Sequence, residues 1–156
     1  AIQAAEVAAT LLLRTPNPPS FAEEVQVVKS TTADTSVTVN PLFTAEEITE
    51  FQHLIRRIPV ADNVIEYAVT LVNKTRPGNA LSNDYVKTYL DWGAGPRASQ
   101  NLILAAKANA ALKGKFSPDI EDVQAVATGI LRHRIIKNYK ADAEGITEEM
   151  IIKKLF

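Results

Sequence analysis

Residues 93–114 read GAGPRASQNLILAAKANAALKG and carry the clearest helix signals in the chain. Pro96 suits the first turn of a helix, because the amide that it lacks would have no intrahelical partner there. Apolar residues then recur at helical spacing, and glycine is the residue type that most often follows a helix end. The stretch therefore predicts a long helix that begins at Gly95 and Pro96 and ends at Gly114.

Similar start signals repeat on both sides of this helix. Ser20 with Glu23 and Thr44 with Glu47 have capping-box spacing, in which each side chain bonds the other residue's amide. Further starts are expected at Asp62, Ser82, Ser117-Pro118 and Thr147. No strand alternation is evident after residue 40, so we predict an all-α fold, a helical bundle of five to six helices.

Helical periodicity also predicts which side chains face the core. The expected inward residues are Ile48, Phe51, Ile55, Ile58, Ile65, Ala68, Leu71, Val72, Val86, Tyr89, Leu90, Leu102, Ala105, Ala106, Leu112, Val123, Val126, Ala127 and Ile130. Residues 1–19 differ, because three prolines at 16–19 break regular structure. We expect them to form an irregular or short-strand N-terminal remnant, and residues 20–156 to form the helical domain.

Composition excludes several classes of protein. The 156 residues are 46% apolar and 22% charged, with a net charge of −1, which argues against binding nucleic acid or an anionic membrane through bulk charge. The absence of cysteine excludes disulfides and thiolate metal sites. No stretch approaches the ~18 consecutive apolar residues that a membrane span needs. The lack of a signal peptide and of cysteine favours a cytoplasmic location.

Most candidate chemical groups have structural explanations. Four carboxylate pairs begin at Glu23, Glu46, Glu121 and Glu148, and each falls in the first turn of a predicted helix, where acids are favoured. His53 is expected on an exposed or boundary flank, and His133 near a helix C-terminus. No metal site is predicted. Residues 113–116 (KGKF) lack the spacing and the Ser or Thr of a phosphate-binding Walker A loop.

Arg97 is harder to explain by stability alone. It falls in the first turn of the long helix, where the helix dipole disfavours a cation. A positive helix end and a guanidinium together favour an anion such as phosphate, which arginine binds with two parallel hydrogen bonds. The structural alternative is that Arg97 stacks on Trp92 or pairs with Asp91.

Six short motifs follow one another between residues 43 and 135. They are 43–48 (FTAEEI), 58–62 (IPVAD), Tyr67-Ala68 with 75–77 (TRP), 93–98 (GAGPRA), 104–108 (LAAKA) and 131–135 (LRHRI). Their order and spacing resemble those of MoxR-type AAA+ ATPases, over about residues 20–156. In that family this region is the C-terminal helical lid.

The resemblance implies a role for Arg97, which matches the sensor-2 arginine of the family. With Pro96 and Ala98 beside it, Arg97 would bind ATP from the lid side and take part in hydrolysis. ATP with Mg²⁺ would lie between the lid and a nucleotide-binding core of the same ATPase, and this chain alone should be inactive. The resemblance further implies a homo-hexameric ring, a von Willebrand factor A protein as partner, and chaperone-like remodelling.

The sequence departs from the family near its start. If 11–14 (LLLR) align with the last core strand, family members carry Asp-Arg-Phe just before it, and this chain has Ala8, Ala9 and Thr10. The arginine expected to act on a ring neighbour is then missing at these positions.

Two other functions remain open. One is a stand-alone helical protein-interaction module without nucleotide chemistry. The other is DNA binding through the basic run of Arg132, Arg134, Lys137 and Lys140, although acidic residues follow at once and such a run is usually a solvated surface.

Overall fold

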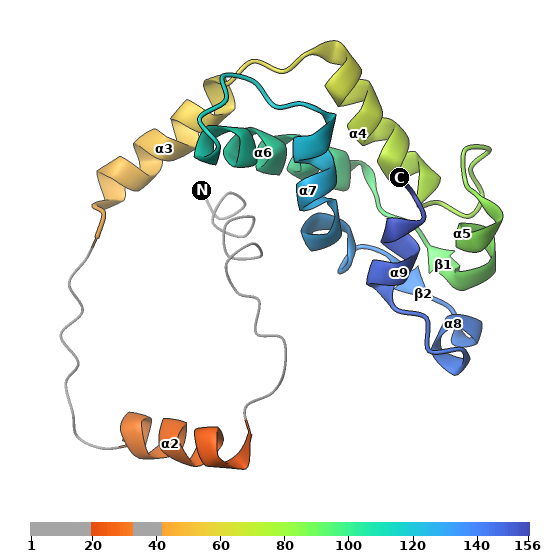
Figure 1. Ribbon diagram of the computed structural model, residues 1–156, viewed down its shortest axis with the longest axis horizontal. Coiled ribbons are helices and arrows are strands. Elements are labelled where there is room, and N and C mark those ends of the chain that lie inside the picture. Colours follow the sequence, from red (N-terminus) through yellow and green to blue (C-terminus); the bar gives the residue numbers. More distant parts are fainter. Residues whose placement is uncertain (1–19, 33–41) are drawn as a thin grey trace.

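The computed structural model describes residues 20–32 and 42–156, and these form helices joined by short loops (Figure 1). The helices are α2 (Phe21–Thr32), α3 (Ala45–Arg57), α4 (Asp62–Lys74), α5 (Asp84–Tyr89), α6 (Pro96–Leu112), α7 (Ile120–Leu131), α8 (Tyr139–Ala143) and α9 (Glu148–Lys153), and the strands are β1 (Leu90–Trp92) and β2 (Ile136–Lys137). The predicted all-α class is confirmed.

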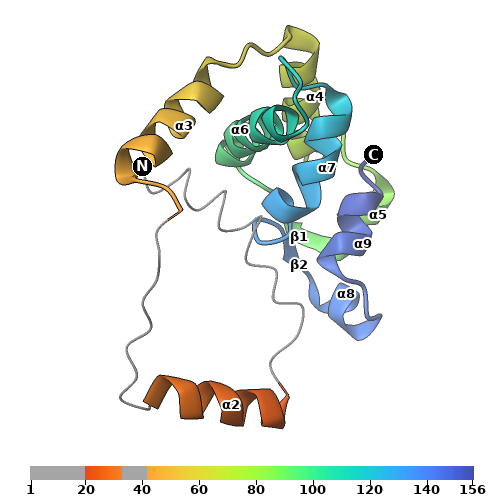
Figure 2. The same ribbon diagram turned by 60° about the vertical axis from the view of Figure 1, so that its left-hand side comes forward.

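The core forms around α6, which packs against α7, α4 and α3, while α9 packs on α7 and α5 (Figures 1 and 2). Ala105, Ala106 and Ala110 give α6 a flat face that lets neighbouring helices approach closely. The buried apolar residues of this core are Val64, Ala68, Leu71, Val72, Val86, Leu90, Ala94, Ala98, Leu102, Ala105, Ala106, Val123, Val126, Ala127, Ile130, Leu131, Ile135, Ile151, Ile152 and Leu155.

Two of the predicted core residues on α4 and α6 prove to be exposed. Ile65 is 40% exposed and its neighbour Val64 is buried, so the inward stripe of α4 is 64, 68, 71 and 72. These positions keep helical spacing but begin one residue earlier than expected. Leu112 is 88% exposed because it is the last residue of α6, beyond the part that its neighbours cover.

Helix α3 is amphipathic but buries no residue completely. Ile55 and Ile58 are half-buried, whereas Ile48 and Phe51, both expected to face inward, are each 47% exposed. Figure 1 shows the reason: only the C-terminal end of α3 lies beside α6, and its N-terminal end projects past the core. Helix α2 lies apart from the others in both views.

A small antiparallel sheet was not expected after residue 40. Strands β1 and β2 pair Leu90 with Lys137 and Trp92 with Ile136. With three and two residues, these strands are too short to show alternation in the sequence. The short helix α8 is also additional to the predicted helices.

The helix boundaries confirm some start signals and correct others. Thr44 and Glu47 form the predicted capping box of α3, and Ser20 bonds reciprocally with Glu23 at the start of α2. Three starts lie one or two residues from the expected place. Ala61 rather than Asp62 precedes α4, Asn83 rather than Ser82 caps α5, and Asp119 rather than Ser117 caps α7.

The predicted remnant at residues 1–19, including Ala8, Ala9 and Thr10, lies outside the described residues. Within 20–32 and 42–156, no helix is long and apolar enough to span a membrane.

Candidate functional site

Arg97 is the second residue of α6, and its side chain is exposed to solvent. Among residues 20–32 and 42–156 it has no hydrogen bond and no ion pair. The structural alternatives raised by the sequence are not found in this part of the chain, because Arg97 forms no ion pair with Asp91 and no cation–π contact with Trp92. Its guanidinium therefore keeps all its donors available for a ligand.

The first turn of α6 differs electrostatically from the other described helices. Each of α2, α3, α4, α5, α7, α8 and α9 carries an acid in its first turn, and α6 carries none. Its N-cap, Gly95, has no side chain to bond the free amides. The positive end of the helix is therefore left without the usual acidic neighbour, and Arg97 adds a full positive charge to it.

The turn before α6 is held by the end of α4. The amide of Ala94 donates to the hydroxyl of Thr75 at 2.9 Å, and the Nε of Arg76 donates to the carbonyl of Ala94, also at 2.9 Å. Ala94 is 1% exposed, so its side chain lies in the core. Both backbone polar groups and the side chain of Ala94 are thus fixed, three residues before Arg97.

Gly93 makes this close approach possible. A Cβ at position 93 would lie 2.4 Å from the carbonyl oxygen of Thr75 and 2.6 Å from the Cα of Arg76. These are backbone atoms that cannot move aside easily, so the turn requires glycine here. A Cβ added at Gly95, two residues later, would have no heavy atom within 4 Å.

Pro96 and Ala98 flank the arginine in different ways. Pro96 is exposed at the first helical position and has no amide to donate. Ala98 is 1% exposed, and its amide donates to the carbonyl of Gly95 at 2.9 Å. Of the three residues predicted to bind a cofactor, only Arg97 offers side-chain donors to solvent.

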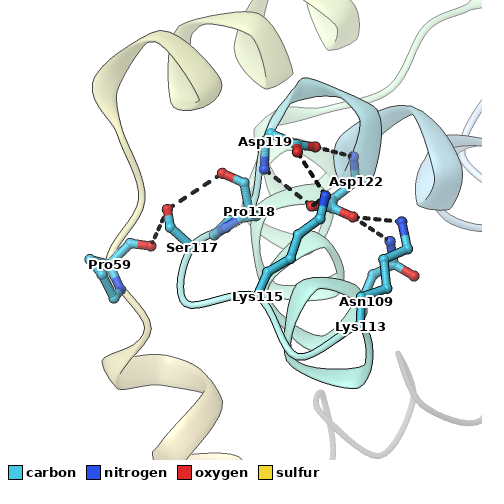
Figure 3. A network of polar contacts seen from close by, with 8 residues as sticks. All are labelled: Pro59, Asn109, Lys113, Lys115, Ser117, Pro118, Asp119 and Asp122. Atoms are coloured by element: carbon cyan, nitrogen blue, oxygen red, sulfur yellow. Dashed lines mark hydrogen bonds and ion pairs between the residues drawn. The ribbon is translucent and has the colours of Figure 1, made fainter.

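The opposite end of α6 has a fully paired set of charges (Figure 3). The carboxylate of Asp122 is buried and accepts from Lys113 Nζ at 2.7 Å, Lys115 Nζ at 3.0 Å and Asn109 at 2.9 Å. Burial alone would raise the pKa of Asp122, but the hydrogen bonds from the two lysines outweigh it and hold the pKa well below its usual value. Asp122 also completes the capping box of α7 with Asp119.

This network extends to the link between α3 and α4. Ser117 donates to the carbonyl of Pro59 at 3.1 Å, so the loop between α6 and α7 is tied to the end of α3 (Figure 3). These contacts explain the polar residues of the loop as structural.

Two of the four basic residues of the run at 132–140 have acidic partners within the chain. Lys137 pairs with Asp142 at 3.1 Å and Glu148 at 3.5 Å, and Lys140 lies 4.0 Å from Glu144. To bind a phosphate, Lys137 and Lys140 would have to give up these acidic partners. The arrangement therefore weighs against nucleic-acid binding through this run.

The two histidines show no sign of a metal site. His53 is exposed on α3, as expected. His133 interacts with Arg134, and its pKa is lowered by burial and by the nearby charges of Arg134 and Arg132. No cluster of histidine and acidic residues in the described ranges could hold a metal ion.

The contacts that hold this turn carry no local sequence signal. Thr75, Arg76 and Gly93 each fall within one of the six motifs, but the motifs do not show that these residues meet at the turn before Arg97. Their contacts join residues 18 or 19 positions apart, and neither periodicity nor capping spacing reveals such contacts.

Comparison with known proteins shows what the chain is similar to. Residues 83–155 match the family described as "AAA lid domain". Over 117 residues the chain is 32% identical to chaperone MoxR1 of Mycobacterium tuberculosis, covering 71% of this chain and 31% of that protein. It is 29% identical over 138 residues to the uncharacterized protein YeaC of Bacillus subtilis, covering 88% and 40%.

A solved structure has a similar fold. A crystal structure from Cytophaga hutchinsonii, described as that of a candidate ATPase, superposes with a TM-score of 0.68 at 29% identity, covering 89% of this chain and 42% of that one. The chain thus spans about a third to two fifths of the length of these proteins. Together with the helical fold, these matches identify the chain as the lid part of a MoxR-type AAA+ ATPase.

Proposed function

We propose that Arg97 is the sensor-2 arginine of the parent ATPase and contributes to ATP binding and hydrolysis from the lid side. The observation that carries this proposal is the exposed, unpartnered guanidinium in the first turn of α6, the described helix whose first turn has no acid. A positive helix end, an arginine and no competing carboxylate fit a phosphate group.

ATP with Mg²⁺ would supply a terminal phosphate whose transfer to water is the chemical step. Arg97 would donate charge-assisted hydrogen bonds to that phosphate, each worth about 1.5–3 kcal/mol. Arg97 would also stabilise negative charge as it develops during transfer, as preorganised cations do in phosphoryl-transfer sites. Pro96 would present the helix end without an amide of its own, and Ala98 would anchor it in the core.

The same contact would make the lid a sensor of nucleotide state. With the terminal phosphate gone, Arg97 would lose its partner, and the lid would be free to rotate relative to the core. A contact made in only one nucleotide state shifts a two-state equilibrium by its own free energy. We propose that this movement drives chaperone-like remodelling of a client.

Several further proposals depend on the parent protein. The nucleotide-binding core of the same ATPase would be the direct partner of this lid, in a homo-hexameric ring, with a von Willebrand factor A protein as accessory partner and a cytoplasmic location. The lid would begin near residue 20. The sequence of this chain contains no Walker A loop, so the core would supply the remaining ATP-binding groups.

The test is the ATPase activity of the intact protein. Arg97→Ala should lower kcat at least about tenfold, because a preorganised cation is lost from the transition state. Arg57→Ala is the matched control, because Arg57 is also exposed but lies at the end of α3. Equal rates in the Arg97 variant and the wild type would exclude the sensor role.

A second candidate function, a helical protein-interaction module without nucleotide chemistry, is favoured by the exposed apolar residues Ile48, Phe51 and Leu54 on α3. It predicts that a partner binds through α3 whether or not ATP is present. Partner binding that depends on nucleotide, and that Arg97→Ala changes, would reject this alternative.

A further inference from the structure

The turn that precedes Arg97 is attached to the rest of the lid at three places. Upstream, β1 pairs with β2 through Leu90 and Trp92. Downstream, Ala98 is buried in the core. Between them, Ala94 is bonded through both its amide and its carbonyl to residues at the end of α4.

Thr75 uses its hydroxyl completely in this arrangement. It is fully buried, donates to the carbonyl of Val72 at 2.6 Å and accepts the amide of Ala94. A hydroxyl has one donor and accepts through its lone pairs, so no water is needed to satisfy the group. Loss of this hydroxyl would leave a buried amide without a partner.

Arg76 makes an unusual set of bonds for an arginine. Its Nε donates to the carbonyl of Ala94, its Nη1 donates to the side-chain oxygen of Asn73 at 2.9 Å, and its own carbonyl accepts from Ser82 at 2.7 Å. In the part of the chain that the structure describes, it forms no ion pair. A guanidinium that bonds only neutral oxygens acts here through its fixed geometry rather than through charge neutralisation.

The first turn of a helix is the part that opens most readily. The bond from Ala98 to Gly95 is the first of α6, and Pro96 cannot add another. If Ala94 were released, the first turn could fray and Arg97 would move with it. The hydrogen bonds of Thr75 and Arg76 with Ala94 therefore hold the turn whose position determines where the guanidinium of Arg97 points.

We propose that Thr75 and Arg76 form a clamp on Ala94 that positions Arg97 for the terminal phosphate. Gly93 is the third part of this clamp, because only glycine allows the turn to lie against the backbone of residues 75 and 76. Thr75 and Arg76 are positioning residues, which act on the ligand through Arg97. This inference rests on the proposed sensor role of Arg97.

The experiment uses the intact ATPase and a double-mutant cycle. Thr75→Val removes the hydroxyl while keeping the shape, and should lower kcat about fivefold with KM for ATP changed less than about twofold. In the Arg97→Ala background the same change should have almost no further effect on kcat, because the clamp acts through Arg97. Equal losses in both backgrounds would overturn the proposal, since a general structural defect adds independently.

Two companion variants separate geometry from charge. Thr75→Ser keeps both hydrogen bonds and should keep the wild-type kcat. Arg76→Lys keeps the charge but loses the Nε donor, and should reduce kcat as Arg76→Gln does. If Arg76→Lys were fully active while Arg76→Gln was not, charge rather than the clamp would be the cause, and the assignment of Arg76 would fail.

Hydrogen exchange gives a readout that is independent of ATP. In the intact protein, Thr75→Val should raise the exchange rate of the peptide covering residues 91–99 at least about tenfold. Thr49→Val is the control, because Thr49 makes a hydroxyl bond to Ala45 on α3, away from this turn. Unchanged exchange would overturn the clamp. Faster exchange together with a fully active Arg97→Ala variant would leave the clamp intact and reject the sensor role.

Discussion

The two ends of α6 use positive charge in opposite ways. At its C-terminal end, Lys113 and Lys115 lie where the helix dipole favours cations, and both bond the buried carboxylate of Asp122. At its N-terminal end, Arg97 lies where the dipole disfavours a cation, and it has no partner within residues 20–32 and 42–156. Charge at one end is arranged for stability, and charge at the other end is left available for a ligand.

This difference also separates fold from function in the same helix. Cations that pair with a buried acid, as Lys113 and Lys115 do with Asp122, can be explained by folding alone. A cation that is exposed and unfavourably placed has no such explanation, although the turn that carries it is held by several hydrogen bonds. A turn held by hydrogen bonds that carries an exposed side chain without a protein partner is typical of binding sites.

The largest expected effect is loss of the buried carboxylate. Asp122→Ala removes three side-chain bonds and the capping box of α7, and should lower the free energy of unfolding by about 3 kcal/mol. Lys113 and Lys115 are partly exposed and can be hydrated, which limits the loss. Arg97→Ala should change stability by less than about 0.5 kcal/mol. Urea unfolding of both variants tests the comparison, and similar losses at the two ends of α6 would contradict it.

The same carboxylate should make the lid sensitive to acid. The pKa of Asp122 lies below its usual value in the folded chain, so its contribution to stability is present above the unfolded-state pKa of about 3.9. It is lost as the pH falls through the folded-state pKa. Urea midpoints measured between pH 5 and pH 2, the range in which this contribution begins to be lost, should fall less steeply in Asp122→Asn than in the wild type. Thr49→Val, which removes an exposed hydroxyl on α3 and changes no titratable group, should keep the wild-type slope.

The turn at the N-terminal end should tolerate no side chain at its first glycine. Gly93→Ala places a methyl group against the backbone of Thr75 and Arg76, and should cost about 2 kcal/mol through the displaced turn. In a lid of this size that corresponds to a decrease in Tm of roughly 4–8 °C. Gly129→Ala on α7 is the control, because no heavy atom lies near its added Cβ. A decrease in Tm for Gly129→Ala as large as that for Gly93→Ala would remove the steric argument.

Local signals explain how much of this fold is predictable from the sequence. Capping boxes and the Pro96 start depend on neighbours within one turn, so the start of α3 and the place of Arg97 in a first turn follow directly. The sequence does not determine how a helix is rotated about its axis. Positions 64 and 65 both fit the apolar stripe of α4, and only packing against the neighbouring helices buries Val64 and leaves Ile65 exposed. The contact between Thr75 and Ala94 could not be predicted, because these residues lie 19 positions apart and meet only in the folded chain.

The smallest expected effect is at Gly95, where the N-terminal end of α6 lacks a side-chain cap. Gly95→Ser adds a hydroxyl that can accept one of the free amides, and the open space around position 95 accommodates it. We expect a gain of about 0.3 kcal/mol, because glycine is itself a tolerable N-cap. ATPase activity should be retained, since the added group caps an amide and leaves the guanidinium exposed. If Gly95→Ser instead lowered kcat as strongly as Arg97→Ala, the free amides of the first turn, and not Arg97 alone, would contribute to the phosphate contact.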